Sequence, residues 1–323
     1  MSLDRALDGV PFAINKFRCL EAARMLSAYE AKEEEFLWSA ETQNAQLIFK
    51  ILFISICHQM NWDVLQDALA RWMLPSPDKR LDEFSETSPS QIRLLLEHYP
   101  KQERVRASER ARKFRQTAND LKSLVSDGGQ LSQLAAKPRL EGPGGFYEIV
   151  GQLEAYQGDP LEKKIRVLAH DLYREKIMAF SDPQALKPAV EYHLIRLYLR
   201  TGRVFPTHNS VAEVLLGQDG SQRRRLVMTL RSVVDEAMRE TAFLSGLDVA
   251  TLNYVEWQLA RTICVSELGR DWHPHCDSAP RAELPEDIAK LVGKQCPYKD
   301  GCQARDDRSY EWFNEPQFEK AIY

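Results

Sequence analysis

Residues 47–56 read Leu-Ile-Phe-Lys-Ile-Leu-Phe-Ile-Ser-Ile. Apolar side chains recur in this stretch at i, i+3 and i+4, for example at Leu47, Ile48, Ile51 and Leu52, and this spacing predicts an α-helix. The stretch is apolar on almost every side, so we expect the helix to be buried. Similar helical patterns cover about residues 12–35, 62–73, 104–126, 146–156, 187–201, 222–243 and 250–265.

Capping signals place the starts of two further helices. Ser88-Pro89-Ser90-Gln91 forms a capping box with proline at the first helical position. Asp159-Pro160-Leu161-Glu162 repeats the arrangement, with Asp159 as the N-cap. The Asp-Gly pairs at 127 and 219 are typical of helix ends, and no Asn-Gly or Asp-Gly pair is flanked by alternating apolar residues as in a β-hairpin. We therefore predict an all-α protein.

Length and composition limit the class of protein. The 323 residues allow about two domains, and an apolar fraction of 44% is enough to build a core. No apolar run approaches the ~18 residues of a membrane span, and the N-terminus lacks the apolar stretch of a signal peptide. We expect a soluble, cytoplasmic protein, with irregular segments at 75–88, 126–145 and 273–294.

Basic residues gather in two places although the net charge is −4. Residues 101–115 hold seven Lys or Arg against two Glu, and Arg223, Arg224 and Arg225 form a second cluster with Arg231. Each cluster fits a solvated helix face, and together they also fit a surface that follows phosphates. The candidate phosphate ligands of the first cluster are Arg104, Arg106, Arg110 and Arg112.

Four of the six cysteines fall in the last 60 residues, in the pattern Cys264-x11-Cys276-x19-Cys296-x5-Cys302. Four thiolates in a cytosolic chain can hold a [4Fe–4S] cluster or a zinc ion. Zinc ligands usually come in pairs two to four residues apart, so this spacing favours iron–sulfur, while His273 and His275 beside Cys276 keep zinc open. Unligated buried thiols are the third interpretation, and it is the one we expect for Cys19 and Cys57.

Residues 188–202 read Pro-Ala-Val-Glu-Tyr-His-Leu-Ile-Arg-Leu-Tyr-Leu-Arg-Thr-Gly. This places the Glu191 carboxylate at the N-terminus of an apolar helix, where the helix dipole favours its ionised form. The residues alone fit either a first-turn glutamate of a buried helix or a catalytic acid.

This stretch resembles a segment of the helix-hairpin-helix DNA glycosylases, the superfamily of endonuclease III and the oxoguanine glycosylases. The resemblance implies that Glu191 serves base excision, with His193, Arg196 and Gly202 in register. Residues 51–63 resemble the helix–turn of the same superfamily that faces the DNA lesion. This implies that Gln59, Met60, Asn61 or Trp62 fills the stack that the flipped base leaves, although a buried Trp with its partners is the plainer interpretation.

Two further stretches resemble the superfamily. Cys296-x5-Cys302 matches the last pair of the iron–sulfur loop in endonuclease III-like enzymes, in the same order along the chain. Residues 163–169 resemble a helix of the archaeal oxoguanine branch that opens with a nucleophilic lysine, which implies that role for Lys164, 27 residues before Glu191. A surface lysine in an exposed turn is the alternative.

The sequence also departs from the superfamily. The acid is Glu instead of Asp, the cysteine spacing is longer, and the Leu-Pro-Gly-Val-Gly hairpin is missing; Gly142-Pro143-Gly144-Gly145 lies too far upstream to be that hairpin.

The pattern is most similar to the alpha-glutamyl/putrescinyl-thymine pyrophosphorylase-like branch. That resemblance implies an enzyme of phage defence that removes a hypermodified base, such as glucosylated hydroxymethylcytosine, from double-stranded DNA.

The expected architecture follows from these matches. One helical lobe, residues 44–180, carries the DNA-facing turn and Lys164; the second, residues 1–43 and 181–323, carries Glu191 and the four-cysteine site, with a cleft between the lobes. We expect a DNA N-glycosylase, with or without an abasic-site lyase step. The alternatives are a non-catalytic nucleic-acid-binding module of the same fold, a nucleosidase, and a repair glycosylase for an oxidised base.

Overall fold

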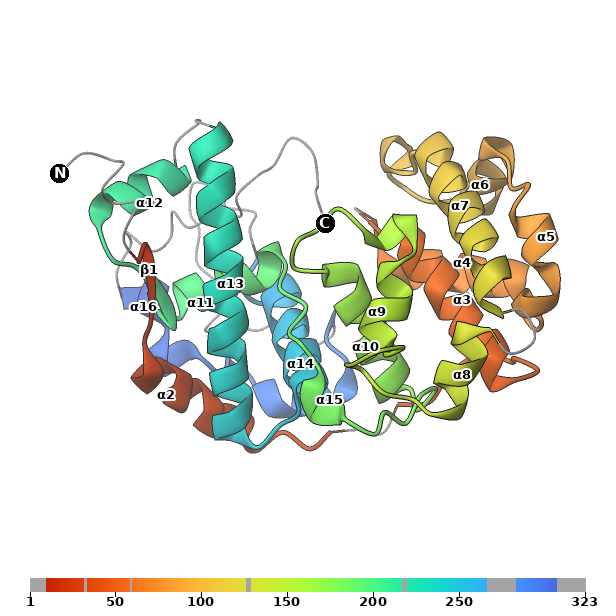
Figure 1. The fold of residues 1–323 in the computed structure, drawn as a ribbon. Coiled ribbons are helices and arrows are strands. Elements are labelled where there is room, and N and C mark those ends of the chain that lie inside the picture. Colours follow the sequence, from red (N-terminus) through yellow and green to blue (C-terminus); the bar gives the residue numbers. More distant parts are fainter. Residues whose placement is uncertain are drawn as a thin grey trace. The chain divides into compact units, whose positions relative to one another are not determined.

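The computed structural model of the protein describes residues 10–31, 34–58, 60–125, 129–216, 220–265 and 283–306. These residues are mostly helical, with one small two-stranded sheet, so the predicted all-α class is confirmed (Figure 1). No helix in these ranges has the length and apolar character needed to cross a membrane.

The chain divides into two compact units. The first contains the described residues up to 31 and from 187 onward, and the second contains the described residues between 34 and 186. The sequence predicts these junctions at 43/44 and 180/181. Residues 34–43 belong to the second unit because Glu34 pairs with Arg174, and because Phe36 and Trp38 pack their rings on Phe49.

Helix α3 (Gln43–Ile56) is the centre of the second unit, and every residue from Leu47 to Ile56 is buried, as its apolar pattern predicts. The one charge in this stretch, Lys50, is neutralised inside the unit by Glu175 and by Asp171, at 3.3 Å from Nζ to Oδ2. Around α3 lie α4 (Trp62–Met73), α7 (Ala107–Val125) and α10 (Lys163–Arg174). The other elements are η1 (Pro77–Arg80), α5 (Leu81–Phe84), α6 (Pro89–Leu95), η2 (Gln102–Arg104), α8 (Gln130–Ala136), α9 (Phe146–Gly151), η3 (Glu154–Tyr156) and η4 (Pro183–Ala185).

Local hydrogen bonds confirm one predicted helix start and correct another. The capping box at Ser88 is present, with both reciprocal bonds to Gln91. Asp159 does not cap α10: its carboxylate accepts from the backbone N–H groups of Leu161 and Lys163, and the turn it makes delays the helix to Lys163. The segments expected to be irregular at 75–88 and 126–145 also contain short helices, namely η1, α5 and α8.

Helix α13 (Gly220–Ser245) packs against α2 (Lys16–Leu26), α11 (Tyr192–Arg200), α12 (Asn209–Leu216) and α14 (Val249–Thr262) in the first unit. Strand β1 (Phe12–Ile14) pairs antiparallel with β2 (Val204–Pro206), so the helix predicted from residue 12 begins only at Lys16, where the Asn15 side chain caps it. Likewise, Gly220 begins a helix instead of ending one. The unit is completed by α15 (Glu286–Val292), η6 (Lys299–Gly301) and α16 (Gln303–Asp306).

A buried ion pair joins three segments of the first unit. Arg203, just after α11, pairs with Glu256 on α14, and both side chains are fully buried. The hydroxyl of Tyr298 donates to the same Glu256 oxygen at 2.8 Å, and the guanidinium of Arg203 lies 3.7 Å from the centre of the Tyr198 ring. The network therefore fixes the segment between Cys296 and Cys302 to helix α14.

Substitution Glu256→Gln should destabilise the protein by about 3–5 kcal/mol, because it leaves the buried Arg203 charge without its carboxylate. Urea unfolding followed by circular dichroism measures the loss. The matched control is Lys290→Gln, which removes an exposed ion pair to Glu286 and should change the free energy of unfolding by less than about 0.5 kcal/mol. Equal losses in the free energy of unfolding from the two substitutions would show that the buried ion pair contributes no more to stability than the exposed one.

Candidate functional site

Glu191 is the N-cap of helix α11, and its side chain is buried at 5% exposure. Its Oε1 accepts a hydrogen bond from the backbone N–H of His193 at 3.2 Å. An N-cap carboxylate satisfies an otherwise unpaired N–H of the first turn and meets the positive end of the helix dipole. The sequence therefore places this acid at a helix N-terminus correctly, and its first role there is structural.

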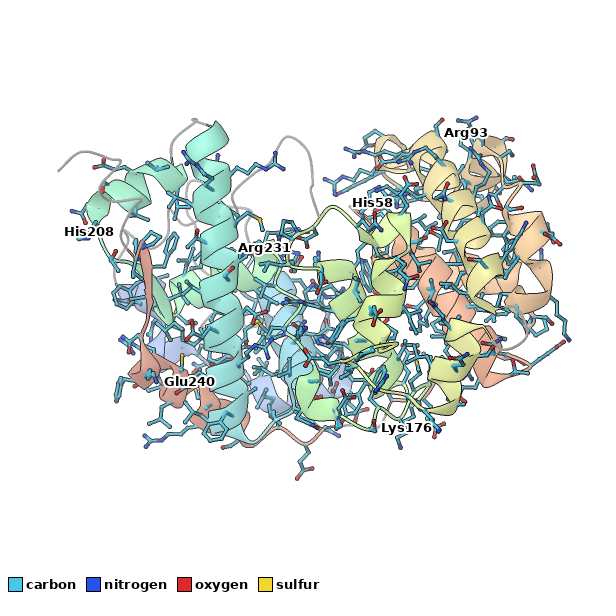
Figure 2. All side chains as sticks on the ribbon, viewed as in Figure 1. His58, Arg93, Lys176, His208, Arg231 and Glu240 are labelled. Atoms are coloured by element: carbon cyan, nitrogen blue, oxygen red, sulfur yellow. The ribbon has the colours of Figure 1, made fainter. Side chains whose placement is uncertain are left out.

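Buried arginines surround the acid-bearing segment. Arg231, expected to be part of a surface cluster, is fully buried and donates to the carbonyl of Val190 at 3.2 Å. Arg196 donates to the carbonyls of Ala260 and Cys264 at 2.7 and 2.5 Å, and it lies 2.9 Å from Nδ1 of His193. Arg196 thus connects the helix of Glu191 to the first cysteine of the predicted metal site. Arg231 is labelled on α13 in Figure 2.

Arg200, at the end of α11, contacts two of the C-terminal cysteines. Its Nη1 lies 3.4 Å from the Cys264 sulfur, and its carbonyl oxygen lies 3.6 Å from the Cys302 sulfur. Cys296 is buried in the same apolar core as Cys264. Gly202 fits the close approach of α16 here: its φ is +67°, and a Cβ at this position would lie 1.9 Å from the Gln303 side chain.

The sulfurs of Cys264 and Cys302 both lie against Arg200, and a thiolate-bound metal or cluster there stays a prediction. The guanidinium N–H of Arg200 on a cysteine sulfur is the kind of hydrogen bond that tunes such sites. Cys276 lies outside the described residues. Within them, no three His, Cys, Asp or Glu side chains form a metal-binding group.

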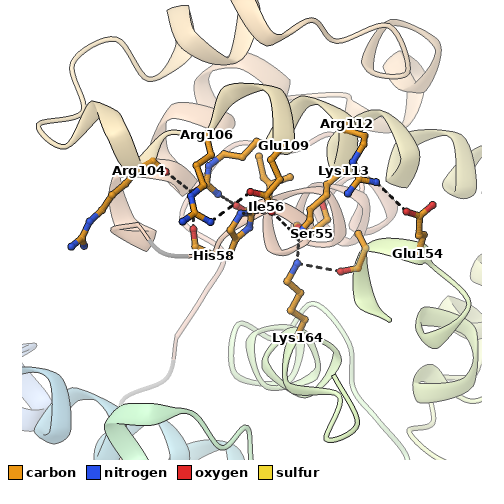
Figure 3. A network of polar contacts seen from close by, with 12 residues as sticks. Ser55, Ile56, His58, Arg104, Arg106, Glu109, Arg112, Lys113, Glu154 and Lys164 are labelled. Carbon is orange, nitrogen blue, oxygen red and sulfur yellow. Dashed lines mark hydrogen bonds and ion pairs between the residues drawn. The ribbon is translucent and has the colours of Figure 1, made fainter. Parts of the chain in front are cut away.

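Lys164 lies in the first turn of α10, in the second unit, and its ammonium is held by two backbone carbonyls. Nζ donates to the Ser55 carbonyl, in the last turn of α3, at 2.7 Å, and to the Ala155 carbonyl at 3.2 Å (Figure 3). Burial and, to a smaller extent, the neighbouring Lys113, Lys163 and Arg110 lower the pKa of this amine to about 8, against the opposing effect of Cys57. Lys164 is therefore not the exposed surface lysine of the alternative interpretation.

The hydrogen bonds of Lys164 suit a nucleophilic amine. A neutral lysine amine has two N–H groups and one lone pair, so two carbonyl acceptors satisfy its donors and leave the lone pair unused. Lysines become nucleophiles when burial or nearby cations lower their pKa. Cys57, beside this cluster, is the opposite case, because burial raises the pKa of its thiol to about 11 and keeps it protonated.

In the helix–turn before α4, one of the described candidate residues is exposed and the other two are buried or half-buried. Asn61 is exposed, but its side chain caps α4 by accepting from the N–H groups of Asp63 and Val64. Trp62 is half-buried with its ring 5.4 Å from that of Phe53, and Met60 is buried. Gln59 lies outside the described residues. The turn is therefore held by local packing, as in the plainer of the two interpretations.

The basic run divides into surface and interior residues. Arg104, Arg106 and Arg112 are exposed, and Arg112 pairs with Glu154 at 3.1 Å. Arg110 is fully buried: it donates to the carbonyls of Ile56, His58, Val105 and Arg104, and burial lowers its pKa to about 10. The structure does not place Arg110 where a phosphate can reach it.

The structure thus gathers the predicted residues in two groups. Glu191, His193 and the described cysteines belong to the first unit, and Lys164 and the basic run belong to the second. Comparison of the sequence with known protein families and with curated proteins found no match.

Sequence reasoning missed three residues of the second group: His58, Glu109 and Lys113. Oε1 of Glu109 lies 3.3 Å from Nε2 of His58 and 3.2 Å from Nζ of Lys113, and Figure 3 labels all three residues. Two of them lie inside the basic run, and His58 lies in the helix–turn motif, but a sequence does not show which side of a helix meets which loop.

The pKa of Lys164 can be tested directly. In protein labelled with 13C at the lysine Cε, one resonance should titrate near pH 8, with the amine charged below that pH and neutral above it. Ordinary lysines titrate near about 10.4. Substitution Lys164→Arg should remove the early-titrating resonance and no other. A Lys164 resonance that titrates with the ordinary lysines would contradict the burial of a functional amine.

The cysteine site predicts a visible spectrum. Protein purified without oxygen should be brown, with broad visible absorption and bound iron, and Cys302→Ala should lose both. Cys57→Ala, in a buried cysteine of the second unit, is the control and should keep them. A colourless protein with bound zinc would change the metal to zinc, and a protein with neither metal would leave only buried thiols.

Proposed function

We propose that this chain is a DNA glycosylase that flips a modified base out of double-stranded DNA and hydrolyses its N-glycosidic bond. The observation that carries the proposal is Lys164, a half-buried lysine whose amine has a lowered pKa in the first turn of a helix, among basic side chains. Together with the resemblance around Glu191, it supplies the two chemical groups that base excision uses.

The chemistry assigns a separate role to each group. Breaking the bond between the base and C1′ builds positive charge on the sugar, and the carboxylate of Glu191 stabilises that charge and orients a water. Where Lys164 attacks C1′ instead, the bond from C1′ to the base breaks and the base leaves with the bonding electrons; the sugar ring then opens at the C1′–O4′ bond, O4′ takes a proton from the lysine nitrogen, and an imine forms between C1′ and that nitrogen. Loss of the phosphate then cleaves the strand, which is the lyase step.

The surface of the second unit supports a DNA partner. Arg104, Arg106 and Arg112 are exposed at the start of α7, where they can neutralise backbone phosphates. Asn61, exposed at the helix–turn, is the candidate to enter the vacated stack. In the first unit, Cys264, Cys276, Cys296 and Cys302 are proposed to hold a [4Fe–4S] cluster, which when bound would tie the C-terminal segment to α11 and α14.

We further propose, from the family resemblance, that the excised base is a hypermodified cytosine of phage DNA, such as glucosylated hydroxymethylcytosine, and that the protein acts in the cytoplasm in phage defence. A second candidate function is a non-catalytic DNA-binding module. The capping bond from Glu191 to His193 favours it, because this bond gives the carboxylate a structural role without catalysis.

Base release from duplex DNA carrying the glucosylated base, read as alkali-labile sites, tests both candidates. Glu191→Gln should slow release by about 10²–10⁴-fold, since the charge that stabilises the sugar cation is gone, while DNA binding persists. Borohydride added during the reaction should trap the protein on DNA through Lys164, and no trapping would mean that water is the nucleophile.

Two variants of Glu191 separate its cap from its charge. Asn is a good N-cap without charge, so Glu191→Asn should keep the fold and lose base release. Glu191→Asp keeps both cap and charge and should retain part of the activity. Full activity of Glu191→Asn would end the assignment of the acid, and salt-dependent DNA binding without any abasic sites would establish the binding module.

A further inference from the structure

The Glu109 carboxylate, in the first turn of α7, lies among three nitrogen-bearing side chains. Oε1 is 3.3 Å from Nε2 of His58 and 3.2 Å from Nζ of Lys113, and Oε2 is 3.7 Å from Nη1 of Arg106. One side of this group is buried and the other is open to solvent. The His58 side chain is 7% exposed, and that of Arg106 is 46% exposed. Figure 3 shows these residues beside Lys164.

His58 is unusual for a buried polar side chain. Neither ring nitrogen makes a hydrogen bond to any described residue, although buried polar groups are normally paired. Burial and, to a smaller extent, the neighbouring Arg110, Lys113, Lys164 and Arg106 lower the pKa of its imidazole to about 2. The ring is therefore neutral, and its contact with Glu109 is not an ion pair; a neutral imidazole still has one N–H to offer to an anion.

The charge around Glu109 is unbalanced. Arg110, Lys113 and Lys163 each lower the pKa of Lys164, so the positive potential of the cluster extends to that amine. The N-terminus of the 19-residue helix α7 adds the positive end of its dipole. One carboxylate does not neutralise this set, and a phosphate group, which has more acceptor oxygens and, as a monoester, more charge, is the better partner for it.

We propose that His58, Arg106 and Lys113 form a binding site for a single phosphate group, and that the Glu109 carboxylate occupies this site in the free protein. The phosphate is either a diester of the DNA backbone or the 5′-phosphate of a free nucleotide. Only the choice of DNA rests on the proposed function, and phosphate binding is measured without base release.

The test compares inorganic phosphate, deoxycytidine 5′-monophosphate and a short DNA duplex, titrated calorimetrically at low salt. Glu109→Gln should tighten phosphate binding by about tenfold, because it removes the competing charge, and Arg106→Gln and Lys113→Gln should each weaken it by about tenfold. For the duplex, each of the last two should also reduce the salt slope by about one. Thermal melting confirms that each variant is folded.

Matched controls separate this site from a general charge effect. Glu97→Gln and Arg93→Gln make the same changes in net charge at exposed positions of the same unit and should shift no affinity by more than about twofold. Tighter binding of the duplex than of the nucleotide assigns the site to the DNA backbone, and equal binding assigns it to a free nucleotide. Should the three site variants behave like the controls with every probe, the phosphate site does not exist.

Discussion

The carbonyls at the end of helix α3 set the constraint on which the second unit depends. A buried helix leaves its last carbonyls without partners, and water is not there to satisfy them. Here cations do so: Lys164 donates to Ser55, and Arg110 donates to Ile56. The hydroxyl of Tyr156 reaches Ile51 one turn earlier, at 2.6 Å. Two positive charges are thereby drawn into the interior at one helix end, which is why the pKa values of both are lowered.

The same constraint connects the stability of the fold to its chemistry. Glu191 caps the N-terminus of α11, and Lys164 caps the C-terminus of α3, so each candidate catalytic group also has a structural role. Such a role does not oppose catalysis, because a group held by hydrogen bonds to a helix end is oriented in advance. It does mean that loss of activity on substitution has two explanations, and that variants which keep the cap while removing the charge carry the most information.

Sequence reasoning recovered what depends on local patterns. The buried helix α3, the capping box at Ser88 and the all-α class followed from periodicity and short-range chemistry. It failed where a side chain or a distant segment decides the outcome. Asp159 makes a turn that delays α10, and residues 12–14 become a strand because β2, almost two hundred residues later, pairs with them. Arg110 looks like its exposed neighbours in the sequence, and only its position over the end of α3 reveals its interior role.

The placement of Arg110 also changes the meaning of the basic run. Arg110 is buried, and its guanidinium donates to the carbonyl of His58. The exposed arginines of the run are Arg104, Arg106 and Arg112. These exposed arginines supply positive charge that any polyanion can neutralise. Fixed positions, more than total charge, distinguish a site for one phosphate from a generally basic surface. Because Arg110 donates to the carbonyls of both Ile56 and His58, the end of α3 and the backbone of His58 are held by one side chain.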